Sequence, residues 1–127
     1  MSHILLIEPD TLLAQSYTQA LQHVGHTVAC ARGAQAAVDA ADRQVPDFVF
    51  VELHLPGHSG IEFLHEFRSY AEWLHIPVVV NTSLTVEQIA PALEALRRDL
   101  GIREVLYKPS TSLQDLVRVV RQHVAVP

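Results

Sequence analysis

The chain has 127 residues, 49% hydrophobic and 18% charged, which is the length and composition of one folded domain and excludes a disordered segment. Nine lysines and arginines against fourteen acidic residues give a formal net charge of −5, which argues against a nucleic-acid-binding role. The longest apolar runs have about four or five residues, whereas a membrane span needs roughly twenty. A single cysteine, Cys30, excludes an internal disulfide and suits a reducing compartment. We therefore expect one cytoplasmic domain over residues 1–127, with no role in nucleic-acid binding and none in a membrane.

Five short apolar runs, mostly β-branched or aromatic, recur along the chain. They are residues 4–7, 27–31, 48–51, 78–80 and 105–107. Continuous apolarity over a few residues is typical of parallel strands that are covered by helices on both faces. The runs therefore predict five buried strands, and Cys30, in the second run, is predicted to be a core residue.

Each apolar run is followed by a stretch in which apolar residues recur every three to four positions, as on one face of a helix. These stretches are residues 12–24, 34–41, 61–67, 86–100 and 113–124. Thr85 with Gln88, and Thr111 with Gln114, have the spacing of a capping box and predict helix starts. Pro91 removes a backbone donor, so we expect a kink or a broken first turn in the fourth helix.

The order of elements is thus strand then helix, repeated five times. Parallel strands joined by helical crossovers form a three-layer α/β fold with a doubly wound sheet. In such a sheet, ligands bind beyond the carboxyl ends of the strands. Glu8 and Asp10 follow the first strand, Glu52 follows the third, Thr82 follows the fourth and Lys108 follows the fifth. The sequence therefore predicts a polar crevice in which carboxylates, a hydroxyl and an ammonium converge.

Four segments of this pattern resemble the receiver domain of two-component response regulators. In order they are residues 4–8 (ILLIE), 51–60 (VELHLPGHSG), 77–83 (PVVVNTS) and 107–109 (YKP), and the resemblance covers the whole chain. It implies a flavodoxin-like (βα)5 fold with strand order 2-1-3-4-5. It also implies a role in phosphorelay signalling, with a histidine kinase or a downstream output protein as partner.

The resemblance assigns roles to the crevice residues. Glu52 stands at the phosphoacceptor position, and Thr82 and Lys108 stand where the family contacts the phosphoryl oxygens. Glu8 corresponds to the first acidic position, with Asp10 close by in the acidic pocket. A Mg²⁺ ion would be held by Glu8, Glu52 and the backbone carbonyl of His54.

Two departures from the family pattern bear on function. The acceptor is glutamate where the family has aspartate, and the added methylene moves the carboxylate by about 1.5 Å. Pro9 stands at the second acidic position and offers no side-chain oxygen. Octahedral Mg²⁺ requires oxygen ligands in near-ideal positions, so we expect its binding to be weak or absent.

Two hypotheses follow for the function. In the first, the chain is a pseudo-receiver: the carboxylate of Glu52 reaches Thr82 and Lys108 and holds one state without a kinase, while the domain signals through its surface. In the second, it remains a phosphorylatable receiver that uses Mg²⁺. We do not expect an enzyme, because no nucleophile–base pair accompanies Glu8 and Glu52. A homodimer through the fourth helix, fifth strand and fifth helix is a further expectation.

His54 and His58 flank a Pro-Gly turn beside Glu52. With Glu8 they could form a zinc site, since imidazole and carboxylate both suit zinc. The plainer interpretation is a pair of solvated loop histidines, and the sequence leaves both open.

Overall fold

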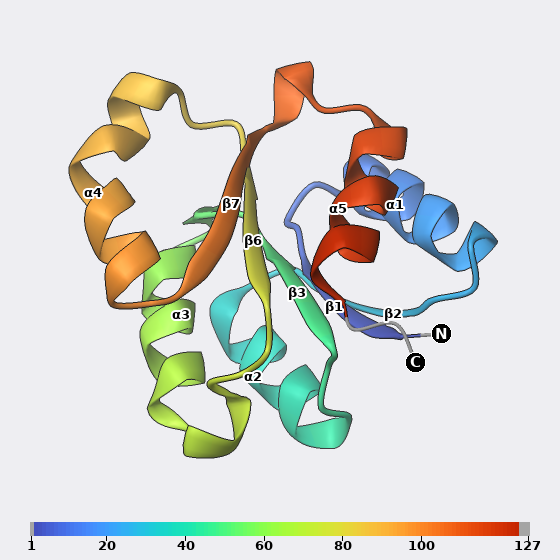
Figure 1. The fold of residues 1–127 in the computed structure, drawn as a ribbon, viewed down its shortest axis with the longest axis horizontal. Coiled ribbons are helices and arrows are strands. Elements are labelled where there is room, and N and C mark those ends of the chain that lie inside the picture. The colour runs from blue at the N-terminus through green and yellow to red at the C-terminus, as the bar shows by residue number, and fades with distance from the viewer. Residues whose placement is uncertain (1, 125–127) are drawn as a thin grey trace.

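Strands and helices alternate along the chain in the computed structural model, which describes residues 2–124 (Figure 1). The strands of the main sheet are β1 (His3–Ile7), β2 (Thr27–Ala31), β3 (Phe48–Val51), β6 (Val78–Thr82) and β7 (Ile102–Tyr107). The helices are α1 (Thr11–His23), α2 (Ala34–Arg43), α3 (Gly60–Ser69), α4 (Val86–Arg98) and α5 (Leu113–His123). Two 3-10 turns, η1 (Ala71–Trp73) and η2 (Lys108–Ser110), complete the order.

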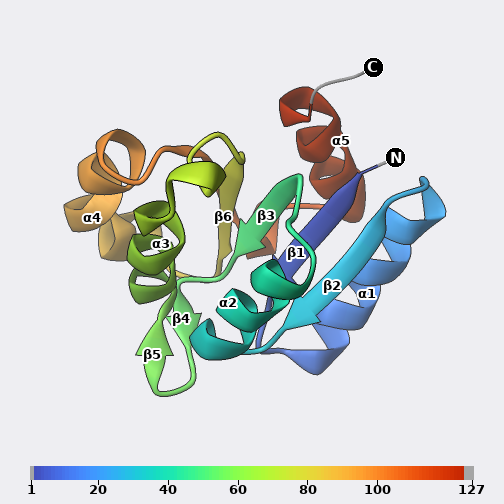
Figure 2. The ribbon, with the colours of Figure 1, turned by 90° about the horizontal axis from the view of Figure 1, so that it is seen from below.

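The main sheet is parallel and has the order β2-β1-β3-β6-β7. Because β6 and β7 are its fourth and fifth strands along the chain, the predicted order 2-1-3-4-5 is confirmed, as is the doubly wound α/β fold. A small antiparallel hairpin, β4 (His54–Leu55) with β5 (His58–Ser59), projects from the loop after β3 (Figure 2). The sequence analysis did not anticipate this hairpin.

The sheet separates two apolar cores, one on each face. Helices α1 and α5 lie on one face, and α2, α3 and α4 lie on the other (Figures 1 and 2). Alternate side chains of a strand point to opposite cores: Leu5 packs toward α2 and α3, whereas Leu6 packs toward α1 and α5. Strands that bury both faces need an apolar residue at nearly every position, which explains the continuous apolar runs.

The prediction for Cys30 was wrong, because its side chain is exposed. Strand β2 lies at the edge of the sheet and pairs only with β1, so its outer side is not covered by another strand. Partial desolvation by its neighbours still raises the pKa of the Cys30 thiol, and the negative charge of Glu8 adds to this effect. The thiol is therefore protonated at neutral pH and a weak nucleophile.

The capping predictions had mixed outcomes. The box of Thr85 and Gln88 is present at the start of α4, and the helix continues through Pro91, so its first turn is not broken. The box of α5 is one residue later than predicted and consists of Ser112 and Asp115. The hydroxyl of Thr111 instead donates to the carbonyl of Tyr107, and this bond closes the preceding turn.

Within residues 2–124, no helix combines the length and the apolarity that crossing a bilayer requires.

Candidate functional site

The carboxyl edge of the main sheet brings four of the predicted side chains together. Glu8 and Glu52 directly follow β1 and β3, and their backbone amides extend the sheet by donating to Ala31 and Ile7. Thr82 is the last residue of β6, and Lys108 is the first residue after β7. Because neighbouring parallel strands end at the same level, residues far apart in sequence become neighbours at this edge.

Lys108 joins the two buried carboxylates. Its Nζ lies 2.7 Å from Glu8 Oε1 and 2.7 Å from Glu52 Oε1. The side chains of Glu8, Glu52 and Lys108 are 2%, 3% and 11% exposed. Charges this deeply buried require a close partner, because transfer from water costs several kcal/mol for each ion. A single ammonium therefore neutralises part of the charge of both carboxylates.

The carboxylate of Glu52 also accepts hydrogen bonds from four other groups. The hydroxyl of Thr82 donates to Oε2 over 2.5 Å, and the amide of His54 donates to the same oxygen over 3.1 Å. The amide of Ser83 donates to Oε1 over 3.2 Å, and the Ser83 hydroxyl lies 3.4 Å from that oxygen. Both oxygens of Glu52 are thus occupied by donors from β6, η2 and the loop after β3.

These contacts set the protonation of the crevice. Burial alone would raise the pKa of Glu52, but the hydrogen bonds from Lys108, Thr82 and His54 outweigh it and lower the pKa below the ordinary value. Burial alone would lower the pKa of Lys108, but Glu52 and Glu8 raise it above the ordinary value. At neutral pH, Glu52 and Lys108 are therefore both ionised.

Gly60 permits the close packing of α3 beneath Glu52. Its amide donates to the carbonyl of Leu53 over 2.7 Å, and an added Cβ would collide with the carbonyl oxygen of Glu52. The hydroxyl of Ser59 caps α3 by accepting from the amide of Glu62. The turn after β3 is therefore held by the start of α3, which fixes the backbone that carries Glu52.

Asp10 does not join the other carboxylates through its side chain. Its Oδ1 accepts from the amide of Leu13 and caps α1, while its own amide donates to Glu8 Oε2 over 3.1 Å. At Pro9 the backbone carbonyl accepts from the guanidinium of Arg32. The loop after β1 thus brings one carboxylate, that of Glu8, into the crevice.

Three contributors to the site had no role in the sequence analysis. Ser83 supplies two of the donors to Glu52, and its position directly after Thr82 was the signal available for it. Asn81 is buried, and its Oδ1 has no hydrogen-bond partner within the described residues. Burial raises the pKa of the Tyr17 hydroxyl, and the side chain of Asn81 partly offsets the rise. No sequence spacing linked Tyr17 on α1 to Asn81 on β6.

The donor set at this edge suits an ammonium better than Mg²⁺. Glu8 and Glu52 are the carboxylates in contact here, and both already bind Lys108. Among residues 2–124 there is no cluster of three or more histidine, cysteine or acidic side chains suited to a metal ion. The proposed zinc site is therefore not formed, and His58 instead lies 3.4 Å from Glu62 on the exposed surface.

Comparison with known proteins identified related sequences. The sequence model described as "Response regulator receiver domain" matches residues 4–121. The KDP operon transcriptional regulatory protein KdpE of Escherichia coli is 30% identical over an alignment of 128 positions that covers 98% of this chain and 54% of KdpE. The probable transcriptional regulatory protein TcrX of Mycobacterium tuberculosis is 30% identical over 90% of this chain and 57% of its own. The alginate biosynthesis transcriptional regulatory protein AlgB of Pseudomonas syringae is 28% identical over 94% of this chain and 25% of its own. The chain thus spans between a quarter and somewhat over half of these relatives.

Solved structures share the fold at lower identity. The chemotaxis protein CheY4 of Vibrio cholerae superposes with a TM-score of 0.85 and 20% identity, covering 98% of this chain and 99% of CheY4. A sensor protein from Polaromonas sp. JS666 superposes with a TM-score of 0.83 and 21% identity, covering 95% and 94%. At these identities the likeness concerns the fold alone.

Proposed function

The chain belongs to the response regulator receiver domain family, and from that premise we propose that it is a pseudo-receiver in which Glu52 stands in for a phosphoryl group. Receiver domains are signalling modules, generally not enzymes, that interact with histidine kinases and output domains. In this proposal the chain signals through its surface, and phosphorylation is reduced or absent.

The contacts of the Glu52 carboxylate are the observation that carries the proposal. Its oxygens accept from Thr82 and Lys108, the two residues that the family resemblance assigns to the phosphoryl oxygens. The amide of Ser83 adds a third donor. The longer side chain of glutamate thus brings an anion to the donors without a bound phosphoryl group.

The mimicry is partial, because a carboxylate carries one negative charge whereas a phosphoryl group carries nearly two. Glu52 also shares Lys108 with Glu8, which further divides the ammonium's charge. We therefore propose that the domain rests in one state with weaker bias than a phosphorylated receiver would have.

The same contacts disfavour phosphoryl transfer to Glu52. An attacking carboxylate oxygen must be free to approach phosphorus in line, and both oxygens of Glu52 already accept hydrogen bonds. The residues present also do not fit Mg²⁺, since Pro9 offers no carboxylate and Lys108 already bridges Glu8 and Glu52.

We propose that partners bind the face formed by α4, β7 and α5. Apolar side chains are exposed on each of these elements: Val86 at the start of α4, Tyr107 at the end of β7 and Leu113 at the start of α5. All three lie at the sheet edge that carries Glu52, so a partner there would contact elements that hold the crevice. An output protein and a second copy of the chain are the proposed occupants.

Incubation with acetyl phosphate and Mg²⁺, followed by intact-mass spectrometry, tests the proposal. We expect no phosphoryl adduct on the parent chain. The double variant Glu52→Asp/Pro9→Asp shortens the acceptor and restores the second carboxylate, so we expect it to gain Mg²⁺ binding and an Mg²⁺-dependent adduct. An efficient adduct on the parent that depends on Mg²⁺ and maps to Glu52 would overturn the proposal.

Two controls make this result specific. Glu52→Gln keeps the length of the side chain and removes the nucleophile, so it must show no adduct under any condition. Pro9→Asp alone restores the metal ligand but keeps glutamate, and it separates loss of Mg²⁺ binding from misplacement of the acceptor.

A further inference from the structure

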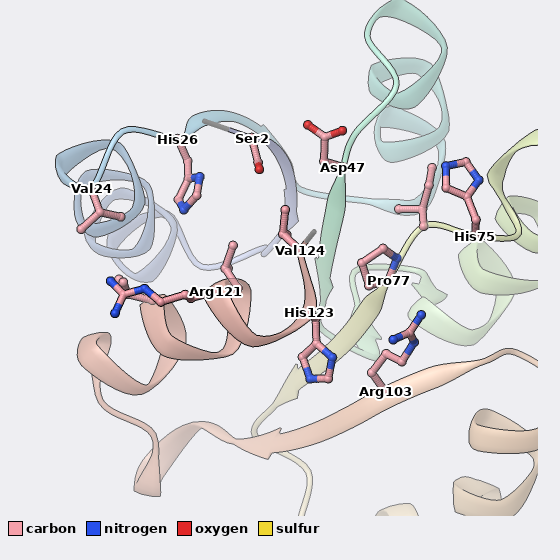
Figure 3. A pocket seen from close by; sticks show the side chains of 13 residues that line it. Ser2, Val24, His26, Asp47, His75, Pro77, Arg103, Arg121, His123 and Val124 are labelled. Atoms are coloured by element: carbon pink, nitrogen blue, oxygen red, sulfur yellow. The ribbon is translucent and has the colours of Figure 1, made fainter. Parts of the chain in front are cut away.

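A cavity of about 510 Å³ lies at the amino edge of the sheet, at the opposite end from Glu52 (Figure 3). The residues that precede or begin each of the five main strands contribute to its lining: Ser2, His26, Asp47, Pro77 and Arg103. The last turns of α5 complete the wall. Cavities that hold small organic ligands usually measure about 300–1,000 Å³, so the volume is sufficient for one.

Part of the cavity wall is apolar. Val117, Val120 and Val124 line it from α5 and its end, and Ile76 and Pro77 line it from the segment before β6. Val120, Ile76 and Pro77 are buried, so this wall is held by the core. Val117 and Val124 are partly exposed and would contact the apolar body of a ligand.

Cationic and imidazole side chains surround this apolar wall. Arg103 and Arg121 lie on opposite sides of the cavity with His123 between them, and His26 and His75 complete the group (Figure 3). Neither arginine forms an ion pair within residues 2–124.

Three other groups of the lining bear on its charge and hydrogen bonding. Nδ1 of His26 is buried and lacks a hydrogen-bond partner in the described part of the chain. Asp47, the carboxylate of the lining, accepts a hydrogen bond from the amide of His3 over 2.8 Å. His123 lies 2.7 Å from Glu104, which offsets its charge when it is protonated. The lining therefore carries two guanidiniums, neither of which has an ion-pair partner among residues 2–124, against the single carboxylate of Asp47.

Helix electrostatics explains part of this group and not the rest. Basic residues in the last turn of a helix complement its dipole, which accounts for Arg121 and His123 on α5. Arg103 lies on β7 and His26 and His75 lie in loops, so the dipole of α5 does not account for them. In a chain with a net charge of −5, two arginines without an ion-pair partner among residues 2–124 and three histidines therefore gather at one cavity, as a site for an anion would require.

We propose that this cavity binds a small organic anion, a carboxylate or phosphate monoester on an apolar body of about two fused rings. The apolar body would pack on Val117 and Val124, and the anionic group would accept from the guanidinium of Arg121 or Arg103. Guanidinium groups bind carboxylate and phosphate oxygens through paired hydrogen bonds, which gives the site its preference for anions. The site is separate from Glu52, so the two proposals stand or fall independently.

Titration of the ¹⁵N-labelled chain, followed by amide NMR shifts, tests this assignment with three matched probes. They are 1-naphthoate, which is anionic, 1-naphthalenemethanol, which is neutral, and 1-naphthylmethylammonium, which is cationic. We expect saturable shifts with 1-naphthoate at His26, Ile76 and Arg103. Binding of the neutral probe should be weaker by about tenfold or more, as expected for loss of a charge-assisted hydrogen bond.

Arg121→Gln and Arg103→Gln should each weaken 1-naphthoate binding and leave binding of the neutral probe unchanged. Replacing the arginine that binds the anionic group more strongly should weaken the affinity for 1-naphthoate by about tenfold. Arg97→Gln on the exposed surface of α4 is the matched control and should have no effect. Unchanged chemical shifts for the amides far from the cavity establish that each variant is folded. The assignment is overturned by equal affinity for the three probes, by shifts that do not saturate at millimolar concentration, or by shifts confined to other surfaces.

Discussion

The two edges of the parallel sheet carry charge in opposite ways. At the carboxyl edge, the ammonium of Lys108 lies 2.7 Å from a carboxylate oxygen of Glu8 and 2.7 Å from one of Glu52, and all three side chains are almost fully buried. At the amino edge, Arg103 and Arg121 line a cavity and form no ion pair within residues 2–124. A buried charge requires a partner within the chain itself, whereas a charge at a solvent-accessible cavity can remain without one until a ligand binds. The carboxyl edge is therefore self-contained, and the amino edge retains the capacity to bind an anion.

The largest effect on stability is expected from removing the ammonium of Lys108 at the carboxyl edge. Lys108→Met leaves the buried carboxylates of Glu8 and Glu52 without their shared cation. We therefore expect the free energy of unfolding to fall by about 3–5 kcal/mol. Urea denaturation measures the loss. Adding Glu8→Gln to this variant removes one of the uncompensated charges and should restore part of the stability.

The control for Lys108 is a cation that has no buried partner. Arg97→Met on the exposed side of α4 should change the free energy of unfolding by no more than about 0.5 kcal/mol. If Lys108→Met and Arg97→Met cost the same, the carboxyl edge is not a coupled charge cluster.

A smaller loss is expected at Thr82, which supplies a neutral donor to the same cluster. Thr82→Val keeps the shape of the side chain but removes its hydrogen bonds with Glu52 and with the amide of Leu84. We expect a loss of about 1–3 kcal/mol, because polar groups remain buried with fewer partners. Thr11→Val on the exposed start of α1 is the matched control and should be nearly neutral.

The pH dependence of the free energy of unfolding should isolate the contribution of the Glu52 carboxylate to stability. Because the pKa of Glu52 is lower in the folded chain, its carboxylate stabilises the fold above the ordinary glutamate pKa, about 4.3. This stabilisation is lost as the pH falls through the lower, folded-state pKa. The stability gap between the parent and Glu52→Gln should then narrow, by up to about 1.4 kcal/mol per pH unit. Urea unfolding from neutral pH to about pH 3 measures the gap, and a constant gap would contradict the depressed pKa.

The fold was predictable because the three central strands, β1, β3 and β6, bury both faces and each helix buries one. Continuous runs such as residues 48–51 and spaced residues such as those of α4 give distinct periods, and the alternation of elements then fixes the class of sheet. The exposure of Cys30 was not predictable from the period, since an edge strand and a central strand can carry similar residues. The start of α5 was misplaced by one residue because Thr111 and Ser112 are both good capping residues.

The residues of the carboxyl-edge crevice were predictable to the extent that they follow strands. Glu8, Glu52, Thr82 and Lys108 all lie directly at strand ends, so the topology alone brings them together. The capping role of Asp10 was not predictable in this way, because it depends on the residue at which α1 begins, Thr11. The amino-edge cavity gave no signal at all, because its lining comes from six separate segments that no local spacing connects.

The smallest effect on stability is expected from removing a cation at the amino edge of the sheet, in contrast to the removal of Lys108 at the carboxyl edge. Arg121→Gln removes a charge that has no ion-pair partner within residues 2–124. We therefore expect the free energy of unfolding to change by no more than about 0.5 kcal/mol in the absence of ligand. With saturating 1-naphthoate, the parent should gain more stability than Arg121→Gln, since a ligand stabilises only the state that binds it. Two buffers, with and without the probe, thus separate a charge that supports the fold from one that is available to a ligand.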